Sequence, residues 1–357
     1  MFNPFGKKSY VGIDIGHYSI KLAQVDRAGN GWRVSKLFTM RTPQDAVRDS
    51  IVVDTEAVGM AIKQGLRQGG INANSAMIGV SGGSVIVRPV RIPKMAEATL
   101  RKSIKFEAGR YVPSSAEDSY IEFEIIGETE DNQMDVLMVA APKDVVESRL
   151  KACDMAGLDV EIVDVEPFAV YRSLVECDPD SEMKPKTIVL IDVGGSTTSM
   201  SIVSDGVFAM ARSLPQGGQT LTEALKNYFK LSEEDAESGK AQLNIAELIE
   251  TAPKENPPLR VVQPHLDDMI REVRRSLNYF QSQAAEVGGT AHKNVDMVVL
   301  CGGGSKMQGL AEYMSHKLGI PTVALGVFSG DRFVGPSADS EVGQELAVVT
   351  GLAMRAA

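Results

Sequence analysis

The chain has 357 residues, of which 43% are hydrophobic and 24% are charged; this composition is typical of soluble globular proteins, and the length favours two domains. No apolar run approaches the ~18 residues that a membrane-spanning helix needs, and the first residues lack the apolar core of a secretory signal. The net charge of −10 argues against nucleic acid or an anionic lipid surface as the main partner, and the 3 cysteines and 4 histidines show no metal-ligand spacing. We therefore expect a protein of the reducing cytoplasm, with neither a zinc site nor a disulfide framework.

The first predicted element is a β-hairpin over residues 11–23. An apolar strand ends in the pattern Asp14-x-Gly16-x-x-Ser19, and a second apolar stretch follows directly after it. The turn therefore presents a carboxylate, a glycine and a hydroxyl together. Because glycine has no side chain, the backbone at this turn can approach a ligand closely.

The same hairpin pattern occurs a second time at residues 189–201. There an apolar strand ends in Asp192-x-Gly194-x-x-Thr197, and again a second strand follows. Two such strand–turn–strand patterns predict a duplicated α/β domain with a cleft between its halves. Two glycine turns that face each other across a cleft can hold a polyphosphate, with backbone donors and hydroxyls on its oxygens.

The two aspartates of these patterns carry the same sign of charge as a phosphate. They suit a phosphate site only if a divalent cation lies between the carboxylates and the phosphate oxygens. Magnesium fits, because it keeps several of its waters and needs only one or two carboxylates. We therefore predict a magnesium–nucleotide site with Asp14 and Asp192 at the metal.

A third glycine-rich turn follows the predicted strand at residues 296–300. It contains Gly302, Gly303 and Gly304, and an amphipathic helix is predicted after it, at residues 310–318. A strand, a glycine turn and a helix start offer backbone N–H groups to an anion. Competing nucleotide motifs are missing from the sequence, because there is no GxxxxGK[ST] pattern and the three glycines do not form GxGxxG.

The chain also contains a GxSxG match, at residues 79–83. A serine nucleophile elbow needs a strand, a turn and then a helix, whereas residues 84–90 continue as a further strand. We therefore do not expect a serine hydrolase.

Two Asp-x-Gly hairpins and a late Gly-Gly-Gly-Ser turn resemble the phosphate-1, phosphate-2 and adenosine motifs of the superfamily of actin, Hsp70 and the sugar kinases. Residues 164–171 and 341–353 resemble the two helices that connect the lobes of that fold. The segment 88–158 is similar to the small inserted subdomain of the division protein FtsA and of PilM, the assembly protein of type IV pili. The stretches 105–113 and 163–174 are especially similar to the PilM family.

The resemblance implies an actin-like α/β fold, the ribonuclease H-like duplicated architecture of a two-lobed ATPase, with an inserted small subdomain of the FtsA and PilM type. We expect seven consecutive parts along the chain. They are 1–87, the first part of the lobe I core with the phosphate-1 hairpin; 88–158, the inserted subdomain; 159–186, the connecting helix and link; 187–220, the lobe II core with the phosphate-2 hairpin; 221–290, the helical subdomain of lobe II; 291–340, the lobe II core with the adenosine motif; and 341–357, the closing helix that returns to lobe I.

The resemblance also implies the residues of an ATP site with magnesium. Asp14 and Asp192 would lie at the metal. The residues expected at the phosphates are Gly16, Ser19, Lys21, Gly194, Gly195, Ser196, Thr197 and Gly218. The residues expected at the adenosine are Gly302, Gly303, Gly304, Ser305 and Met307, with Glu237, Lys240, Arg275 and Asn278 at its ribose or adenine. For the last four the alternative is a charge or cap on a surface helix, and for Lys21 it is a solvent-facing strand position.

Hydrolysis of ATP requires a group that orients water toward the terminal phosphate. Glu166, at the start of the connecting helix, is the candidate by analogy with Hsp70. The alternative for Glu166 is a carboxylate that stabilises the helix N-terminus. Family members of this type resemble nucleotide-responsive scaffolds, so we expect ATP binding with weak or absent ATPase activity.

The resemblance further implies a partner at the inner membrane. PilM-like proteins bind the cytoplasmic N-terminal tail of PilN in a groove between the lobe I core and the inserted subdomain. We therefore expect a PilN-like peptide there, and a peripheral position on the cytoplasmic face of the inner membrane. Phe106, Tyr111 and Tyr120 are candidates for the groove, with core packing as the alternative for each. Self-association and other pilus platform or motor proteins as partners stay open.

Other settings also stay open from the sequence. A related type II secretion system could be served in place of a pilus. An FtsA-like filament protein would attach to the membrane by a basic amphipathic C-terminal helix, and we expect none after the closing helix. A sugar kinase would need a catalytic aspartate on a substrate loop, and no residue stands out in that role.

Overall fold

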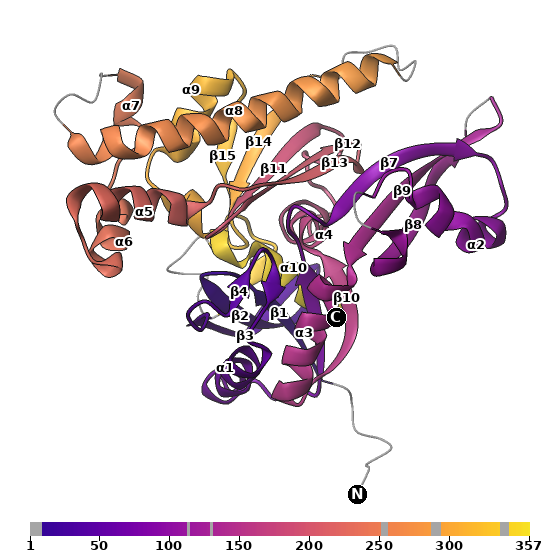
Figure 1. Ribbon diagram of the computed structural model, residues 1–357, viewed down its shortest axis with the longest axis horizontal. Coiled ribbons are helices and arrows are strands. Elements are labelled where there is room, and N and C mark those ends of the chain that lie inside the picture. Colours follow the sequence, from indigo (N-terminus) through magenta and orange to yellow (C-terminus); the bar gives the residue numbers. More distant parts are fainter. Residues whose placement is uncertain (1–8, 113–114, 129–130, 251–255, 287–293, 336–342) are drawn as a thin grey trace, which may run out of the picture. The chain divides into compact units, whose positions relative to one another are not determined.

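The computed structural model describes residues 9–112, 115–128, 131–250, 256–286, 294–335 and 343–357. The chain divides into two compact units, which are drawn together as a ribbon in Figure 1. Unit 1 consists of Met1–Ser81, Ala141–Asp180 and Gly326–Ala357, and unit 2 consists of Gly82–Ala140 and Ser181–Leu325.

Unit 1 is built on a six-stranded sheet with the order β10-β6-β1-β2-β3-β16. Its strands are β1 (Tyr10–Ile15), β2 (Ser19–Ala28), β3 (Gly31–Arg41), β6 (Ser75–Val80), β10 (Asp159–Val165) and β16 (Phe333–Val334). The first three strands form an antiparallel meander, whereas β6 lies parallel to both β1 and β10. The hairpin that the first Asp-x-Gly pattern predicts is therefore confirmed as β1 and β2.

Helices of unit 1 pack on this sheet in pairs. They are α1 (Thr55–Gln68), α3 (Lys143–Ala156), α4 (Glu166–Tyr171) and α10 (Ala347–Ala353), and a π-helical segment, Arg172–Glu176, continues α4. Figure 1 shows α1 beside α3, and the backbone contacts also pair α4 with α10. Short 3-10 turns, Gln344–Leu346 and Met354–Ala356, flank α10. The short strands β4 (Val47–Arg48) and β5 (Ile51–Val52) form a separate hairpin.

The contact between α10 and its neighbours depends on glycine. A Cβ atom at Gly351 would lie 1.9 Å from the carbonyl oxygen of Ala169 in α4, and one at Gly12 would lie 2.6 Å from the carbonyl oxygen of Val349. Arg172 fastens the same crossing, because its Nη1 donates to the carbonyl oxygen of Gly351 at 2.8 Å and its Nη2 lies 2.9 Å from Asp164 Oδ2. The segments that resemble connecting helices are thus helical, and residues 341 and 342 lie outside the described residues.

Unit 2 is built on an eight-stranded sheet with the order β15-β14-β11-β12-β13-β7-β9-β8. Its strands are β7 (Ile86–Pro93), β8 (Ser119–Glu128), β9 (Gln133–Pro142), β11 (Thr187–Val193), β12 (Thr198–Ser204), β13 (Val207–Leu214), β14 (Met297–Cys301) and β15 (Thr322–Ala324). The strands β11, β12 and β13 are antiparallel, and β14 lies parallel to β11. Because β13 pairs with β7, the inserted strands extend the sheet that carries the second Asp-x-Gly turn, and β8 forms its outer edge.

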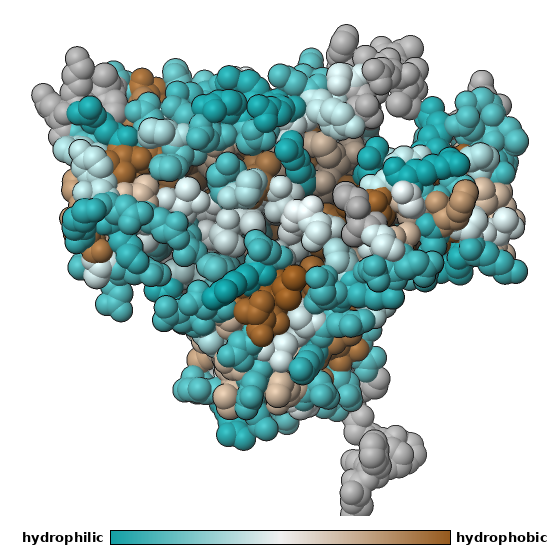
Figure 2. All heavy atoms as spheres, in the orientation of Figure 1, coloured by the Kyte–Doolittle hydropathy of each residue, from teal (hydrophilic) through white to brown (hydrophobic). Residues whose placement is uncertain are grey.

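Helices of unit 2 bury two separate apolar cores. The helices are α2 (Glu97–Ala108), α5 (Gly218–Phe229), α6 (Glu233–Ala241), α7 (Glu247–Glu250), α8 (Pro257–Glu286) and α9 (Leu310–Leu318), with 3-10 turns at Ala116–Asp118 and Gly303–Lys306. Helix α2 covers the inserted strands, and the long helix α8 packs with α5 and α9 over the rest of the sheet. Figure 2 shows mainly hydrophilic residues on the outer sides of α5, α6 and α8.

The two compact units divide the chain differently from the seven parts expected from the sequence. We expected the inserted subdomain to run from 88 to 158, whereas the segment grouped with unit 2 is Gly82–Ala140. Helix α3 belongs to unit 1 because it packs closely on α1, where a Cβ atom at Gly59 would lie 2.8 Å from the carbonyl oxygen of Ala152. The apolar pattern of α3 shows that it is amphipathic but does not show which sheet it covers.

We predict that Gly351→Ala destabilises the protein, whereas Gly239→Ala does not. The added methyl at position 351 would overlap the backbone of α4, and overpacking of this kind costs about 1–3 kcal/mol. At Gly239, in α6, no atom lies within 4 Å of the added Cβ, so the better helix propensity should add ~0.5–1 kcal/mol. Urea unfolding of the three proteins measures both changes, and equal stability of wild type and Gly351→Ala would contradict the close crossing.

Candidate functional site

The second Asp-x-Gly turn joins β11 to β12 in unit 2. Asp192 is the last residue but one of β11, and the turn closes where Gly194 N–H donates to the carbonyl oxygen of Thr197 at 3.0 Å. Within the described residues, the backbone N–H groups of Gly195 and Ser196 donate no hydrogen bond. Such donors at the tip of a turn suit an anion.

The N-terminus of helix α5 lies directly against this turn. Gly218 N–H donates to the carbonyl oxygen of Gly194 at 2.9 Å, and Gln219 N–H donates to that of Gly195 at 2.8 Å. A Cβ atom at Gly217 would lie only 2.4 Å from the carbonyl oxygen of Gly195, so glycine is required for this approach. Sequence reasoning selected Gly218 but missed Gly217, although the Gly-Gly pair was the available signal. The helix start adds its partial positive charge to the turn.

The third glycine turn meets the same aspartate. Gly302 has a φ of +84°, and a Cβ atom there would lie 2.1 Å from Asp192 Oδ1. A Cβ atom at Gly304 would lie 2.4 Å from Cγ1 of Val193. The Ser305 hydroxyl donates to the carbonyl oxygen of Gly302 at 2.7 Å and so holds the turn, and Met307 lines a small hollow together with Val193, Gly217, Gly218, His265 and Met269.

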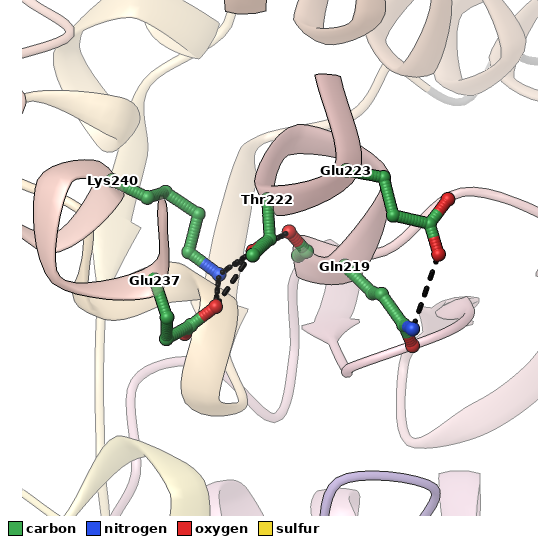
Figure 3. Close-up of polar contacts among 6 residues, drawn as sticks. Gln219, Thr222, Glu223, Glu237 and Lys240 are labelled. Atoms are coloured by element: carbon green, nitrogen blue, oxygen red, sulfur yellow. Dashed lines mark hydrogen bonds and ion pairs between the residues drawn. The ribbon is translucent and has the colours of Figure 1, made fainter. Parts of the chain in front are cut away.

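A polar network between α5 and α6 contacts Gly218 at the start of α5 (Figure 3). Lys240 Nζ donates to the carbonyl oxygen of Gly218 at 3.2 Å, to Thr222 Oγ1 at 2.9 Å and to Glu237 Oε2 at 2.7 Å. The Thr222 hydroxyl in turn donates to Glu237 Oε2 at 2.6 Å. The i,i+3 pair Glu237 and Lys240 is therefore not a loose surface pair, since it fixes α6 to the first turn of α5. Thr222 carries no recognisable motif and was missed in the sequence.

Arg275 and Asn278 lie elsewhere in unit 2. Both are exposed residues of α8, and Arg275 Nη1 is paired at 2.6 Å with Glu272. Glu272 also lies 3.5 Å from Arg212 in β13, and Arg275 and Asn278 come after Met269, the residue of α8 that lines the hollow at the glycines. Within the described residues, no contact brings these two side chains to the glycine turns.

In unit 1 the first Asp-x-Gly turn carries an ion pair. Asp14 and Lys21 are paired in the register of β1 and β2, and Lys21 Nζ lies 2.7 Å from Asp14 Oδ2. Gly16 N–H donates to the carbonyl oxygen of Ser19 at 3.1 Å, and a Cβ atom at Gly16 would lie 2.9 Å from that oxygen. Lys21 therefore contacts the carboxylate proposed for the metal and does not simply face solvent.

Glu166 is the first residue of α4, and its Cγ lies 2.9 Å from the position that a Cβ atom of Gly79 would take. Gly79, near the end of β6, begins the GxSxG match, and the strand β6 is followed by the strand β7, as predicted. Burial lowers the pKa of Arg149 in α3, and the charges of Glu166 and Asp14 oppose this shift. Arg149 thus lies near two predicted site residues, and sequence reasoning missed it.

The described residues contain no group of three or more His, Cys, Asp and Glu side chains able to hold a metal. Burial, and then the charge of Asp192, raises the pKa of the Cys301 thiol well above its ordinary value, so this cysteine stays protonated. In the same part of the chain no helix is both long and apolar enough for a membrane span.

Aromatic residues of the inserted segment differ in exposure. Phe106 is 73% exposed and Tyr120 is 46% exposed, so neither side chain is buried in a hydrophobic core. Tyr111 packs against the core beneath α2, as the alternative reading held, and the guanidinium of Arg88 lies 5.2 Å from its ring centre. The exposed Phe106 ring is flanked in sequence by Lys105 and Glu107.

The fold and these turns define an actin-like protein, with one Asp-x-Gly hairpin in each unit and a further glycine-rich turn in unit 2. A family model described as "Type IV pilus assembly protein PilM" matches residues 12–357, and the chain belongs to this family. Among solved structures, the "PilM-PilN type IV pilus biogenesis complex" is similar with a TM-score of 0.81 and 25% identity, over 97% of this chain and 98% of that one.

More distant relatives share the fold. MreB5 of Spiroplasma citri, solved bound to AMPPNP, has a TM-score of 0.51 and 12% identity, over 98% of this chain and 96% of that one. The cell division protein FtsA of Bacillus subtilis (strain 168) is 21% identical over 66% of this chain. The match covers 58% of the length of that FtsA. Similarity at this level supports the actin-like fold.

We predict that Lys240→Ala lowers the free energy of unfolding by roughly 1.5–3 kcal/mol, the usual worth of hydrogen bonds to a charged group. The substitution would remove three hydrogen bonds and leave Glu237 without its cation. Lys226→Ala is the matched control, because Lys226 forms only an exposed pair with Glu233 at 3.6 Å, and exposed pairs are worth about 0–1 kcal/mol. Urea unfolding compares the two variants, and equal effects would contradict a structural role of the network.

Proposed function

We propose that this protein is an ATP-binding scaffold of the type IV pilus assembly platform, which binds the cytoplasmic N-terminal tail of a PilN-like membrane protein in a nucleotide-responsive manner. The observation that carries the proposal is the match to the PilM family over residues 12–357. The similarity to the PilM-PilN complex supports the choice of partner. The proposed location is the cytoplasmic face of the inner membrane, reached through that partner.

The two glycine turns of unit 2 and the adjacent start of α5 support the proposal of ATP as ligand. Gly195 and Ser196 would offer backbone N–H donors to phosphate oxygens, and Ser196 and Thr197 would offer hydroxyls. Gly194 and Gly218 would lie beside the phosphates without side chains, next to the N-terminus of α5. The glycines 302–304 leave open the space beside Asp192 that side chains would fill. Ser305, Met307, Glu237 and Lys240 are proposed to border the adenosine. For Arg275 and Asn278, a contact with the ribose or adenine is proposed from family resemblance alone.

The residues proposed in unit 1 are Asp14 for magnesium and Gly16, Ser19 and Lys21 for the phosphates. Bound magnesium would neutralise phosphate charge, which neither aspartate can do. Lys21 is already oriented by Asp14, so its ammonium group needs little reordering to meet an anion. Glu166 is proposed to orient water, and we expect slow or absent ATP hydrolysis.

We predict that Asp192→Asn weakens ATP binding at least tenfold in magnesium and changes it little in EDTA. Loss of the carboxylate would remove a proposed magnesium ligand, and a tenfold change corresponds to about 1.4 kcal/mol. Asp205→Asn is the matched control, since Asp205 lies in the β12–β13 turn of the same unit, where its φ of 52° also suits asparagine. Titration calorimetry with ATP measures both variants. Wild-type protein that does not bind ATP would refute the nucleotide part of the proposal.

We predict that a synthetic PilN-type N-terminal peptide binds the wild type, and that Phe106→Ser weakens this binding by at least threefold. A ring with 73% exposure costs little to remove from the folded protein, so a loss of binding would reflect contact with the peptide. Tyr228→Ser is the matched control, because Tyr228 in α5 is 67% exposed. Fluorescence anisotropy of a labelled peptide measures the affinities.

Two results would change the assignment. Peptide binding that Phe106→Ser and Tyr228→Ser leave equal would remove Phe106 from the binding surface. ATP binding with filament formation and no peptide binding would favour a filament protein like FtsA, the alternative that the similarity to the Bacillus subtilis protein supports.

A further inference from the structure

Arg149 of helix α3 is an unusually buried cation. It is the largest of the fully buried side chains among the described residues and is only 2% exposed. Its Nη1 donates to the carbonyl oxygens of Ser50 and, at 3.2 Å, Val145, whereas its Nε has no hydrogen-bond partner in the described part of the chain. Burying a charged guanidinium costs folding free energy unless nearby anions compensate for it.

The compensating charges come from the candidate site of unit 1. Glu166, the proposed water-orienting residue, acts most strongly in favour of the charged guanidinium, and Asp14 acts next. Asp14 is itself only 6% exposed and is paired with Lys21. The negative charges of Glu166 and Asp14 therefore favour the charged form of the buried Arg149 guanidinium.

The hydrogen bonds of Arg149 lead to the small hairpin of β4 and β5. The tip of this hairpin is Asp49 and Ser50, both with positive φ (48° and 67°), as in a two-residue turn that twists with its strands. The carbonyl of Ser50 accepts from Arg149, and Val52 N–H donates to the Ser148 hydroxyl at 3.2 Å. Helix α3 thus holds the hairpin at its tip and at its second strand.

The other side of the hairpin holds the phosphate-1 turn. His17, between Gly16 and Ser19, donates from Nδ1 to the carbonyl oxygen of Val47 in β4 at 2.9 Å. Val47 and Val52 are buried in the same core as β1 and α3, so the hairpin cannot move without disturbing both. A continuous set of contacts therefore runs from α3 through the hairpin to the turn that carries Asp14 and Gly16.

We propose that Arg149 is a positioning residue of the nucleotide site: it clamps the β4–β5 hairpin against the phosphate-1 turn. The part of this proposal that concerns nucleotide affinity rests on the proposed ATP binding. The part that concerns the position of the turn does not, because it follows from contacts within unit 1.

The test compares four proteins: wild type, Arg149→Met, Arg149→Lys and Cys153→Ala. Methionine keeps an unbranched buried chain without charge, and lysine keeps the charge. Cys153, one turn further along α3 and 0% exposed, is the control for a loss of core packing that leaves the charge in place. Hydrogen–deuterium exchange of peptides covering residues 14–19 and 46–53 reports on the turn and hairpin, and calorimetry reports the ATP affinity with magnesium.

We expect Arg149→Met to raise amide exchange in both segments and to weaken ATP binding about tenfold, the effect of losing hydrogen bonds to a charged group. Arg149→Lys should restore affinity to within about threefold of wild type, because the buried charge is kept. Cys153→Ala should leave both segments and the affinity unchanged. Equal effects of Arg149→Met and Cys153→Ala would overturn the proposal.

Two further results separate the possible failures. If wild type does not bind ATP, the proposed function fails, and the exchange data still decide whether Arg149 positions the turn. If Arg149→Met does not fold, Ser148→Ala replaces it, since it removes the bond that Val52 N–H of the hairpin donates and, apart from that, only the local bond from the Ser148 hydroxyl to the carbonyl oxygen of Val145 within α3. Faster exchange of residues 14–19 in Ser148→Ala would then support the contact path through the hairpin, and wild-type exchange there would overturn it.

Discussion

The arrangement of unit 1 depends on one steric constraint, the close approach of three backbones around α10. Helix α10 fits between β1 and α4 only because Gly12 and Gly351 have no side chains. That approach brings the start of α4, and with it Glu166, to the end of β6 beside Gly79. Arg172 then fixes the crossing with an ion pair to Asp164 and a hydrogen bond to Gly351. Two glycines and the half-buried Arg172 thus determine where Glu166, the catalytic candidate, lies.

The cations of the candidate site are buried more deeply than the composition of the chain would suggest. The protein carries a net charge of −10, yet Lys21, Lys240 and Arg149 are each paired or compensated inside it. Each of them lies beside a glycine turn or its supporting helix, where a polyphosphate would be bound. The carboxylates of the candidate site therefore compensate its cations, an arrangement that only the folded structure reveals.

Much of the fold was predictable from the sequence, because the signals were local. Two Asp-x-Gly hairpins, the glycine turn at 302–304 and helix α9 each have a pattern contained in a few neighbouring residues, and all four are confirmed. What could not be predicted depends on distant partners. Thr222 and Arg149 acquire their roles from residues 15 to 99 positions away, and nothing in their own neighbourhood marks them. Arg275 was chosen from family resemblance alone, and it lies on an exposed face of α8, where it pairs with Glu272.

The insertion of β7, β8 and β9 into unit 2 leaves β8 as the outer strand of a large sheet. An unpaired strand edge is a template on which other chains can add. Three glutamates, Glu122, Glu124 and Glu128, are exposed along this edge. Two copies that met edge to edge would bring these carboxylates together, and like charges disfavour such pairing. The carboxylates along β8 therefore count against edge-to-edge pairing of two copies of this sheet.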